Sequence, residues 1–218
     1  SKPVNLDPMI RNVYIQGMTK RQRVEAVIRG EHPDHAPVSF WHHFSPEQAT
    51  GQRAVDAHLA FLEKYDVDFL KVMNDHHFPR GELNVARSAQ DLKKLQPLAG
   101  DVPGFAGQLE VLRKLREHVG PDVPLCTTIF NAWAILRYLT QPPSDHHGPP
   151  SINGQDQRDD AISAMLAEDR SAVRAGLEAI ATSLANFARE CIRAGADGVF
   201  LSVRDDWVNT PANGPQTY

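Results

Sequence analysis

Hydrophobic residues are arranged along the chain in short continuous runs and in longer stretches with helical spacing. Short apolar runs rich in β-branched residues predict buried strands, whereas apolar residues spaced three and four apart predict amphipathic helices. The runs predict strands at residues 37–41, 67–73, 123–130 and 199–203. The helical spacing predicts helices at residues 21–29, 53–65, 88–95, 104–119, 131–139 and 169–194.

Local signals support several of these helices. Thr19 and Ser88 are residues that favour N-caps, and Gly30 is expected to end the first helix. The buried face of the first helix is expected to carry Val24, Val27 and Ile28. The apolar face of the helix at 53–65 is expected to carry Ala54, Val55, His58, Leu59 and Leu62.

Strand and helix alternate four times, which is the pattern of a parallel sheet with helical crossovers. Two architectures fit this pattern: a four-stranded doubly wound sheet, and the first half of an eight-stranded barrel. The lack of a glycine-rich turn after the first strand disfavours a nucleotide-binding version of the doubly wound sheet. In a half-barrel the fourth strand would have an unpaired edge, which favours a homodimer or aggregation of the fragment.

Two segments differ from the rest of the chain. Residues 1–17 are interpreted as a leader or expression segment, because a helix signal follows Met18 at once. The globular part is therefore expected at residues 18–218. Within it, residues 141–157 are rich in proline and polar side chains and predict an excursion that could serve as a lid.

Composition excludes several classes of partner. The net charge is −4 and the basic residues are scattered, so nucleic acid is not expected as a partner. No apolar run approaches the roughly 18 residues of a membrane span, and no signal peptide is recognised, so a cytoplasmic protein is expected. Cys126 and Cys191 lack zinc-site spacing and are expected to be free, buried thiols.

Polar residues that can carry chemistry follow two of the predicted strands. Asp75 and the pair His76-His77 come directly after the strand at 67–73, and His42-His43 follows the first strand after Trp41. The carboxyl ends of parallel strands share one edge of the sheet, where α/β proteins place their active sites. We therefore expect an active site there.

The alternation of side chains along a strand lets only one histidine of each pair point inward. One histidine from each pair together with Asp75 would suit zinc or ferrous iron. Hydrogen bonds from these imidazoles to substrate or loop backbone are the favoured interpretation, so no metal is expected at this site.

Three segments, Met18–Val24, Arg29–Val38 and Ala194–Gly198, carry a family resemblance. They resemble the uroporphyrinogen decarboxylase-like (URO-D) superfamily, and the similarity extends from residue 18 to about residue 205. The segment around Asp75 is similar to the one in which the family's catalytic aspartate follows the second strand. The segment Trp133–Leu139 is similar to the one whose tyrosine lies beside that aspartate, here Tyr138.

The resemblance implies a (β/α)8 TIM barrel, of which this chain covers roughly the first four β/α units. It implies cofactor-independent decarboxylation of a carboxylated substrate, for example a tetrapyrrole of porphyrin biosynthesis. Asp75 would stabilise the positive charge that develops on the substrate, and Tyr138 would orient the Asp75 carboxylate. The candidate substrate-binding residues are Trp41, His42, His43, His76, His77 and Arg204, with Asp205, Asp206 and Trp207 as further contacts.

One departure from the family pattern favours other functions. Uroporphyrinogen decarboxylases carry an Arg-Gln-Ala-Gly-Arg-Tyr motif after the first strand, where this chain has Trp41–Pro46. The loss of two guanidinium groups disfavours a substrate with many carboxylates. Corrinoid-dependent methyl transfer, with zinc bound in the second half of the barrel, is the alternative. A noncatalytic small-molecule binding protein is a third.

Overall fold

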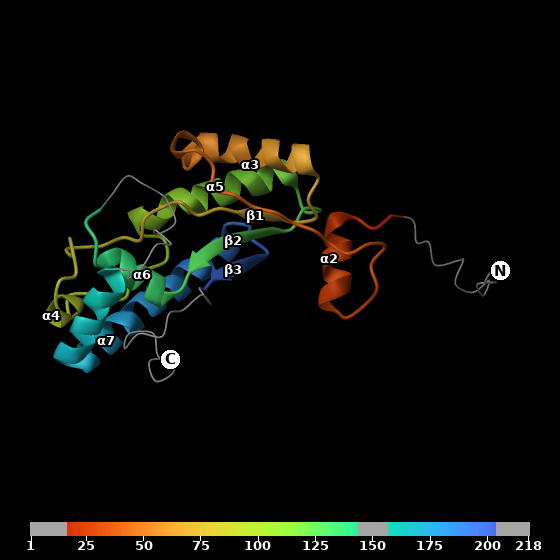
Figure 1. The fold of residues 1–218 in the computed structure, drawn as a ribbon. Coiled ribbons are helices and arrows are strands. Elements are labelled where there is room, and N and C mark those ends of the chain that lie inside the picture. Colours follow the sequence, from red (N-terminus) through yellow and green to blue (C-terminus); the bar gives the residue numbers. More distant parts are fainter. Residues whose placement is uncertain (1–16, 144–156, 204–218) are drawn as a thin grey trace.

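The computed structural model describes residues 17–143 and 157–203. Its elements, labelled as in Figure 1, are α2 (Lys20–Ile28), the 3₁₀ helix η1 (Pro46–Gln48), α3 (Gly51–Tyr65), β1 (Leu70–Val72), α4 (Ala89–Leu92), α5 (Pro103–Val119), β2 (Leu125–Phe130), α6 (Ala132–Leu139), α7 (Gln157–Arg193) and β3 (Gly198–Ser202). Most of the predicted leader and of the excursion at 141–157 lies outside the described residues.

The strands form one parallel sheet in the order β1-β2-β3. Leu70 of β1 lies opposite Leu125 of β2, and Cys126 of β2 lies opposite Gly198 of β3. Parallel neighbours need a crossover between them, which α5 and α7 provide. The prediction of a mixed α/β fold with a parallel sheet is therefore confirmed, and three of the four expected strands are present.

The expected first strand, at residues 37–41, is not a strand. The Asp68 N–H donates to the Val38 carbonyl (2.8 Å), but the Val38 N–H donates to the Asp68 carboxylate (2.7 Å). The Ser39 hydroxyl donates to the Phe69 carbonyl (2.7 Å). Val38 and Ser39 therefore lie alongside the start of β1 through one backbone hydrogen bond and two that involve a side chain, without a regular backbone ladder. Pro37 has no N–H to donate to such a ladder.

The two faces of the sheet differ. The core between the sheet and α3, α5 and α7 includes Val55, Phe61, Leu70, Val72, Leu109, Leu112, Leu125 and Phe187. Because side chains alternate along a strand, the other face carries Lys71, Cys126, Thr128 and Phe200, and it is called the inner face below. Figure 1 shows α2 at the end where the strands begin, with α4 and α6 at the opposite end.

The first helix is fixed by charged residues. Thr19 caps α2 in a capping box with Gln22, as predicted, and Gly30 follows with φ +73°. The expected apolar face is wrong, however, because Val27 and Ile28 are 47% and 78% exposed.

Arg23 is the buried charged residue of α2, beside the buried Ala26. Its guanidinium pairs with Asp34 (2.7 Å) and with Asp68, next to the start of β1. Burying this cation is tolerated because two carboxylates compensate the lost hydration.

Asp197, in the turn before β3, ties three elements together. Its carboxylate accepts hydrogen bonds from Arg21 of α2 (2.7 Å), from Arg116 of α5 (2.5 Å) and from the Leu125 N–H of β2 (2.8 Å). Burial would raise the pKa of Asp197, but these donors and the two guanidinium charges outweigh burial and lower it. Through Asp197, the segment Ala194–Gly198 thus connects α2, α5 and β2 at the end of the sheet where the strands begin.

The long helix begins earlier than the sequence predicts. α7 starts at Gln157, but Asp169 has non-helical dihedral angles (φ −156°, ψ 92°) and interrupts it. The Asp169 carboxylate accepts from the Ala172 N–H (3.0 Å), so it caps the second part in the manner of an N-cap residue. The predicted start at residue 169 therefore marks a real boundary, whereas the helix before it was not predicted.

Within the described ranges, none of the helices combines the length and the apolar character needed to cross a bilayer.

The exposed β3 generates a prediction about association. Val199, Leu201 and Val203 are 45–60% exposed, and an apolar strand at the edge of a sheet is a template for pairing with another chain. We expect the 218-residue chain to self-associate, and we expect Leu201→Lys to reduce this association because edge charges oppose strand pairing. Ile28→Lys, on exposed α2, is the control. Light scattering after size exclusion checks this; a monomeric parent chain would contradict it.

Candidate active site

The end of β1 is held by side chains from two helices. Met73, just beyond the strand, donates its N–H to Nε2 of His58 on α3 (3.0 Å). Its carbonyl accepts from the side-chain amide of Gln108 on α5 (3.1 Å), which also donates to Thr127 of β2 (3.1 Å). Buried peptide groups need such partners, so these bonds fix the backbone that leads to Asp75.

His58 is a buried, neutral histidine with a defined tautomer. It is 2% exposed, and its Nδ1 donates to the Ala54 carbonyl (2.7 Å), which leaves Nε2 as the acceptor for the Met73 N–H. Burial lowers the pKa of His58, although the Ala54 hydrogen bond and the charge of Asp75 act in the opposite direction. The sequence pattern placed His58 on an apolar helix face but gave no sign of this role.

Asp75 and His43 form a carboxylate–imidazole pair. Asp75 is 7% exposed, and its Oδ1 lies 2.8 Å from Nδ1 of His43. An ionised carboxylate only accepts hydrogen bonds, so Nδ1 of His43 carries the proton and Nε2 remains for a ligand. The His43 side chain is about one-third exposed, so the pair stands at the boundary between the core and solvent.

The neighbouring histidines point in different directions, as strand-like alternation predicts. The ring of His42 packs against Phe44 (4.6 Å between centroids) and Phe61 of α3 (5.4 Å), away from Asp75. In the second pair, His76 is half-buried and His77 is exposed.

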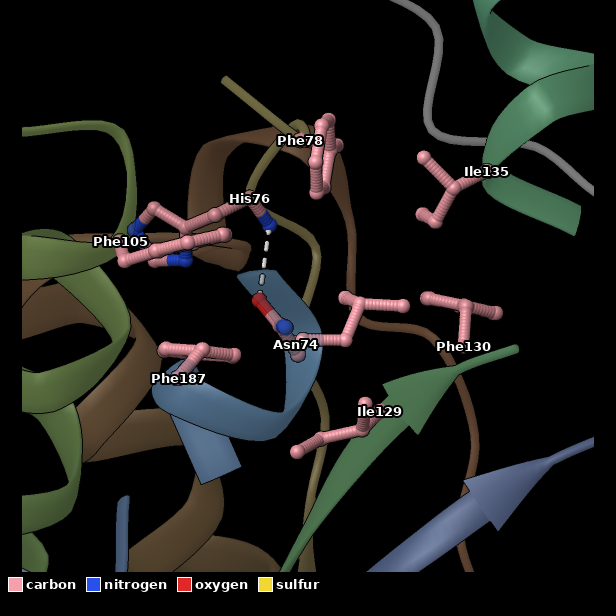
Figure 2. Close-up of a pocket in the computed structure, with 9 residues that line it drawn as sticks. Asn74, His76, Phe78, Phe105, Ile129, Phe130, Ile135 and Phe187 are labelled. Atoms are coloured by element: carbon pink, nitrogen blue, oxygen red, sulfur yellow. Dashed lines mark hydrogen bonds between the residues drawn. The ribbon is translucent and has the colours of Figure 1, made fainter. Parts of the chain in front are cut away.

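A small hollow lies beside the segment that follows β1. Its volume is about 20 Å³, room for about one water molecule. Asn74 and His76 stand at its centre, joined by a 3.3 Å hydrogen bond from the His76 N–H to the Asn74 side chain. Figure 2 shows Phe105 and Phe187 on one side of them and Ile129, Phe130 and Ile135 on the other.

Small residues on α5 make room for the segment that follows β1. A Cβ atom at Gly107 would lie 2.4 Å from Nε2 of His76, and a Cβ atom at Gly104 would lie 2.5 Å from the ring of Pro79. Real Cβ atoms do not approach other heavy atoms so closely. The two glycines therefore position residues 76–79 by letting them contact the helix directly.

The remaining predicted site residues lie apart from Asp75 or outside the described residues. Tyr138, on α6, is 37% exposed; its ring packs edge-on against Phe130 (6.3 Å), and it shares no hydrogen bond with Asp75. The predicted contacts at Arg204 and at residues 205–207 lie outside the described residues.

The structure adds one residue that the sequence pattern did not single out. Lys71 lies in the middle of β1, is 5% exposed, and places its ammonium 3.6 Å from the ring centre of Trp41 and 3.7 Å from that of Phe200. Trp41 also contacts the ring of His43 edge-on (5.8 Å). The only signal in the sequence was a charged residue inside an apolar strand run.

Metal-binding groups are dispersed in the part of the chain that the structure describes. Within residues 17–143 and 157–203, no three His, Cys, Asp or Glu side chains lie close enough to share a metal ion. Cys126 and Cys191 are free thiols, as predicted, and burial raises their pKa values to about 11 and about 12.

Comparison with known proteins gives the family. The profile of the uroporphyrinogen decarboxylase (URO-D) family matches residues 71–210. A methyltransferase from Methanosarcina mazei has a similar fold, with a TM-score of 0.55 and 18% identity over 84% of this chain and 58% of that chain. No curated protein matches.

The profile covers more than half of the chain, so the chain belongs to the URO-D family. It spans little more than half the length of the similar methyltransferase.

The buried His58 predicts how stability depends on pH. His58 binds a proton near pH 6.5 in the unfolded chain but only at lower pH in the folded chain. The contribution of neutral His58 to the free energy of unfolding is therefore present above pH 6.5 and is lost as the pH falls below it. We expect a loss of up to about 1.4 kcal/mol per pH unit below pH 6.5. His58→Gln should remove this component, and His32→Gln, at an exposed turn, should keep it. Urea unfolding between pH 8 and 5 checks this; equal slopes in both variants would contradict it.

Gly107 provides a second test. Glycine to alanine in a helix normally stabilises by about 0.5–1 kcal/mol, but here the added Cβ atom would clash with His76. We expect Gly107→Ala to destabilise the protein by roughly 1–3 kcal/mol, the usual effect of overpacking. Adding His76→Ala to Gly107→Ala should recover the lost free energy of unfolding, as measured by urea unfolding. A stabilised Gly107→Ala protein would show that His76 does not contact the helix.

Proposed function

We propose that the chain is the N-terminal half of a cytoplasmic URO-D enzyme with a (β/α)8 barrel. Residues 37–41, which precede β1 in the chain and lie alongside its start, would occupy the position of the first barrel strand. Strands β1–β3 would then be the second, third and fourth. The exposure of Val199, Leu201 and Val203 supports this proposal, because further barrel elements would cover them. The inner face of the sheet would then line the barrel interior, with Asp75 at its carboxyl end.

The proposed reaction is carbon–carbon cleavage with release of carbon dioxide. The observation that carries it is the 2.8 Å contact between His43 Nδ1 and Asp75 Oδ1 at a buried strand end, in a chain of this family. A carboxylate beside an imidazole can hold it in one tautomer and stabilise the imidazolium that forms during proton transfer.

The two residues would act in sequence on a substrate whose carboxylate is attached to an electron-rich group. His43 would first take up a proton from solvent at Nε2, while its Nδ1 proton stays directed at Asp75. This imidazolium would donate the Nε2 proton to the substrate, and the Asp75 carboxylate would stabilise the cationic intermediate. The bond to the carboxylate would then break, and its electron pair would return to the cationic group as carbon dioxide leaves. No organic cofactor takes part in these steps.

The other candidates would contact substrate. Tyr138, half-exposed on α6 at the carboxyl end of the sheet, would hydrogen-bond a substrate carboxyl group. His76 and Trp41 would line the site beside the reacting group.

Methyl transfer with zinc and a corrinoid is the second candidate. It is favoured by Trp41–Pro46, which replaces the arginine-containing motif of uroporphyrinogen decarboxylases. The zinc ligands of this alternative would lie in the second half of the barrel, outside residues 17–143 and 157–203. Transfer of a methyl group to a corrinoid by the full-length protein, without release of carbon dioxide, would favour this alternative.

Asp75→Asn in the full-length protein tests the proposed reaction. The substitution keeps the shape and removes the charge, so turnover should fall by roughly 10²-fold or more. His43→Gln should cost a similar factor and add little once Asp75 is replaced, because two residues that act as a unit are not additive. Carbon dioxide release from a panel of carboxylated tetrapyrroles and aromatic acids is the assay.

Tyr138→Phe is the matched control for this cycle. Because Tyr138 shares no hydrogen bond with Asp75, its smaller loss should add to that of Asp75→Asn. An Asp75→Asn enzyme with the parent rate would remove Asp75 from the mechanism. A protein that binds these acids and converts none of them would point to a noncatalytic binding protein.

A further inference from the structure

Lys71 is buried without a charged partner among the described residues. It lies in β1 at 5% exposure, and its ammonium makes no hydrogen bond or ion pair within residues 17–143 and 157–203. The other deeply buried cation described above, Arg23, has two carboxylates beside it. Withdrawing an ammonium from most of its water without a compensating charge is unfavourable, so this position costs stability.

The aromatic surroundings of Lys71 favour a positive charge but do not accept hydrogen bonds from the N–H groups of its ammonium. The faces of Trp41 and Phe200 lie 3.6 Å and 3.7 Å from the ammonium, and aromatic faces attract a cation by their quadrupole. An ammonium has three N–H donors, for which these rings are poor acceptors. A ligand that carries a negative charge would supply what the rings do not.

The two rings are themselves accessible. Trp41 is 51% exposed and Phe200 is 43% exposed, although both pack against a buried charge. Trp41 lies in the segment before η1, outside any helix or strand. The position therefore combines an ammonium with two aromatic surfaces that a planar ligand could contact.

Lys71 belongs to the same face of the sheet as the candidate catalytic pair. Lys71, Met73 and Asp75 alternate onto the inner face, and four residues of extended chain span about 13 Å. Trp41 bridges the two positions, because its ring contacts both the Lys71 ammonium and the ring of His43. Lys71 thus lies within β1, whereas the Asp75–His43 pair lies beyond the carboxyl end of that strand.

We propose that Lys71, Trp41 and Phe200 form a subsite that binds the carboxylate of an aromatic acid. The ammonium would pair with the carboxylate, and the two rings would contact the aromatic part of the ligand. The subsite stands on its own geometry. That its ligand is the substrate of the Asp75–His43 pair rests on the proposed function.

The charge of Lys71 makes binding depend on pH. Burial lowers the pKa of Lys71 to about 8. The titratable side chain that faces it is Cys126 of β2, the register partner of Lys71, and burial raises the pKa of that thiol to about 11. Segment 37–44 contributes Trp41, whose ring contacts that of His43 edge-on, and β3 contributes Phe200. Anion binding should therefore weaken above pH 8 as Lys71 loses its proton.

The test compares 2-naphthoate with the neutral 2-naphthamide by calorimetry on the full-length protein. We expect the acid to bind at least ten-fold more tightly than the amide at pH 7. This preference should decrease by about ten-fold per pH unit once the pH exceeds the pKa of Lys71. Lys71→Met, which keeps the apolar stem, should abolish the preference while melting at or above the parent temperature. Lys71→Arg should keep part of it.

Asp75→Asn separates this proposal from the proposed function. It should lower turnover by roughly 10²-fold or more but keep the preference for the acid over the amide. Equal binding of acid and amide by the parent protein, binding of neither, or a preference that survives in Lys71→Met would each overturn the subsite. The pH series on the parent protein needs no variant and decides the outcome even if the Lys71 variants fail to fold. A preserved preference without any decarboxylation would overturn the proposed function alone.

Discussion

The peptide group of Met73 must find hydrogen-bond partners from outside the sheet, because it is buried just beyond the last residue of β1. His58 of α3 accepts from its N–H, and Gln108 of α5 donates to its carbonyl. Helices α3 and α5 are thereby hydrogen-bonded to the backbone of Met73, two residues before Asp75. The position of Asp75, its contact with His43 and the path of residues 76–79 over α5 all depend on these bonds to Met73.

Buried polar side chains surround Met73 in an otherwise apolar core. His58, Gln108 and Asp75 are buried and satisfied by hydrogen bonds, whereas Lys71 has only aromatic neighbours within the described residues. Buried polar networks of this kind are kept where geometry matters more than stability. The same sheet packs apolar side chains against its helices, and the candidate site residues lie on the inner face and at the carboxyl end of the strands.

The sequence predicted most helices and three strands, because periodicity and capping residues such as Thr19 and Ser88 are local signals. The strand at 37–41 was wrong because pairing depends on partners distant in sequence, and here the Asp68 side chain takes the place of backbone pairing. Family resemblance singled out Asp75, and strand alternation predicted that His43 and His42 diverge. The roles of His58 and Lys71 could not be predicted, since each depends on rings and peptide groups that only the fold brings together.

The most direct measurement of the Asp75–His43 contact is the tautomer of His43, observed by long-range ¹H–¹⁵N correlation spectroscopy on the full-length protein. An ionised Asp75 requires the proton on Nδ1, so the spectrum should show Nδ1–H with a downfield proton, and Asp75→Ala should abolish that signal. A His43 protonated on Nε2 alone, or a spectrum unchanged by Asp75→Ala, would contradict the pairing on which the proposed chemistry depends.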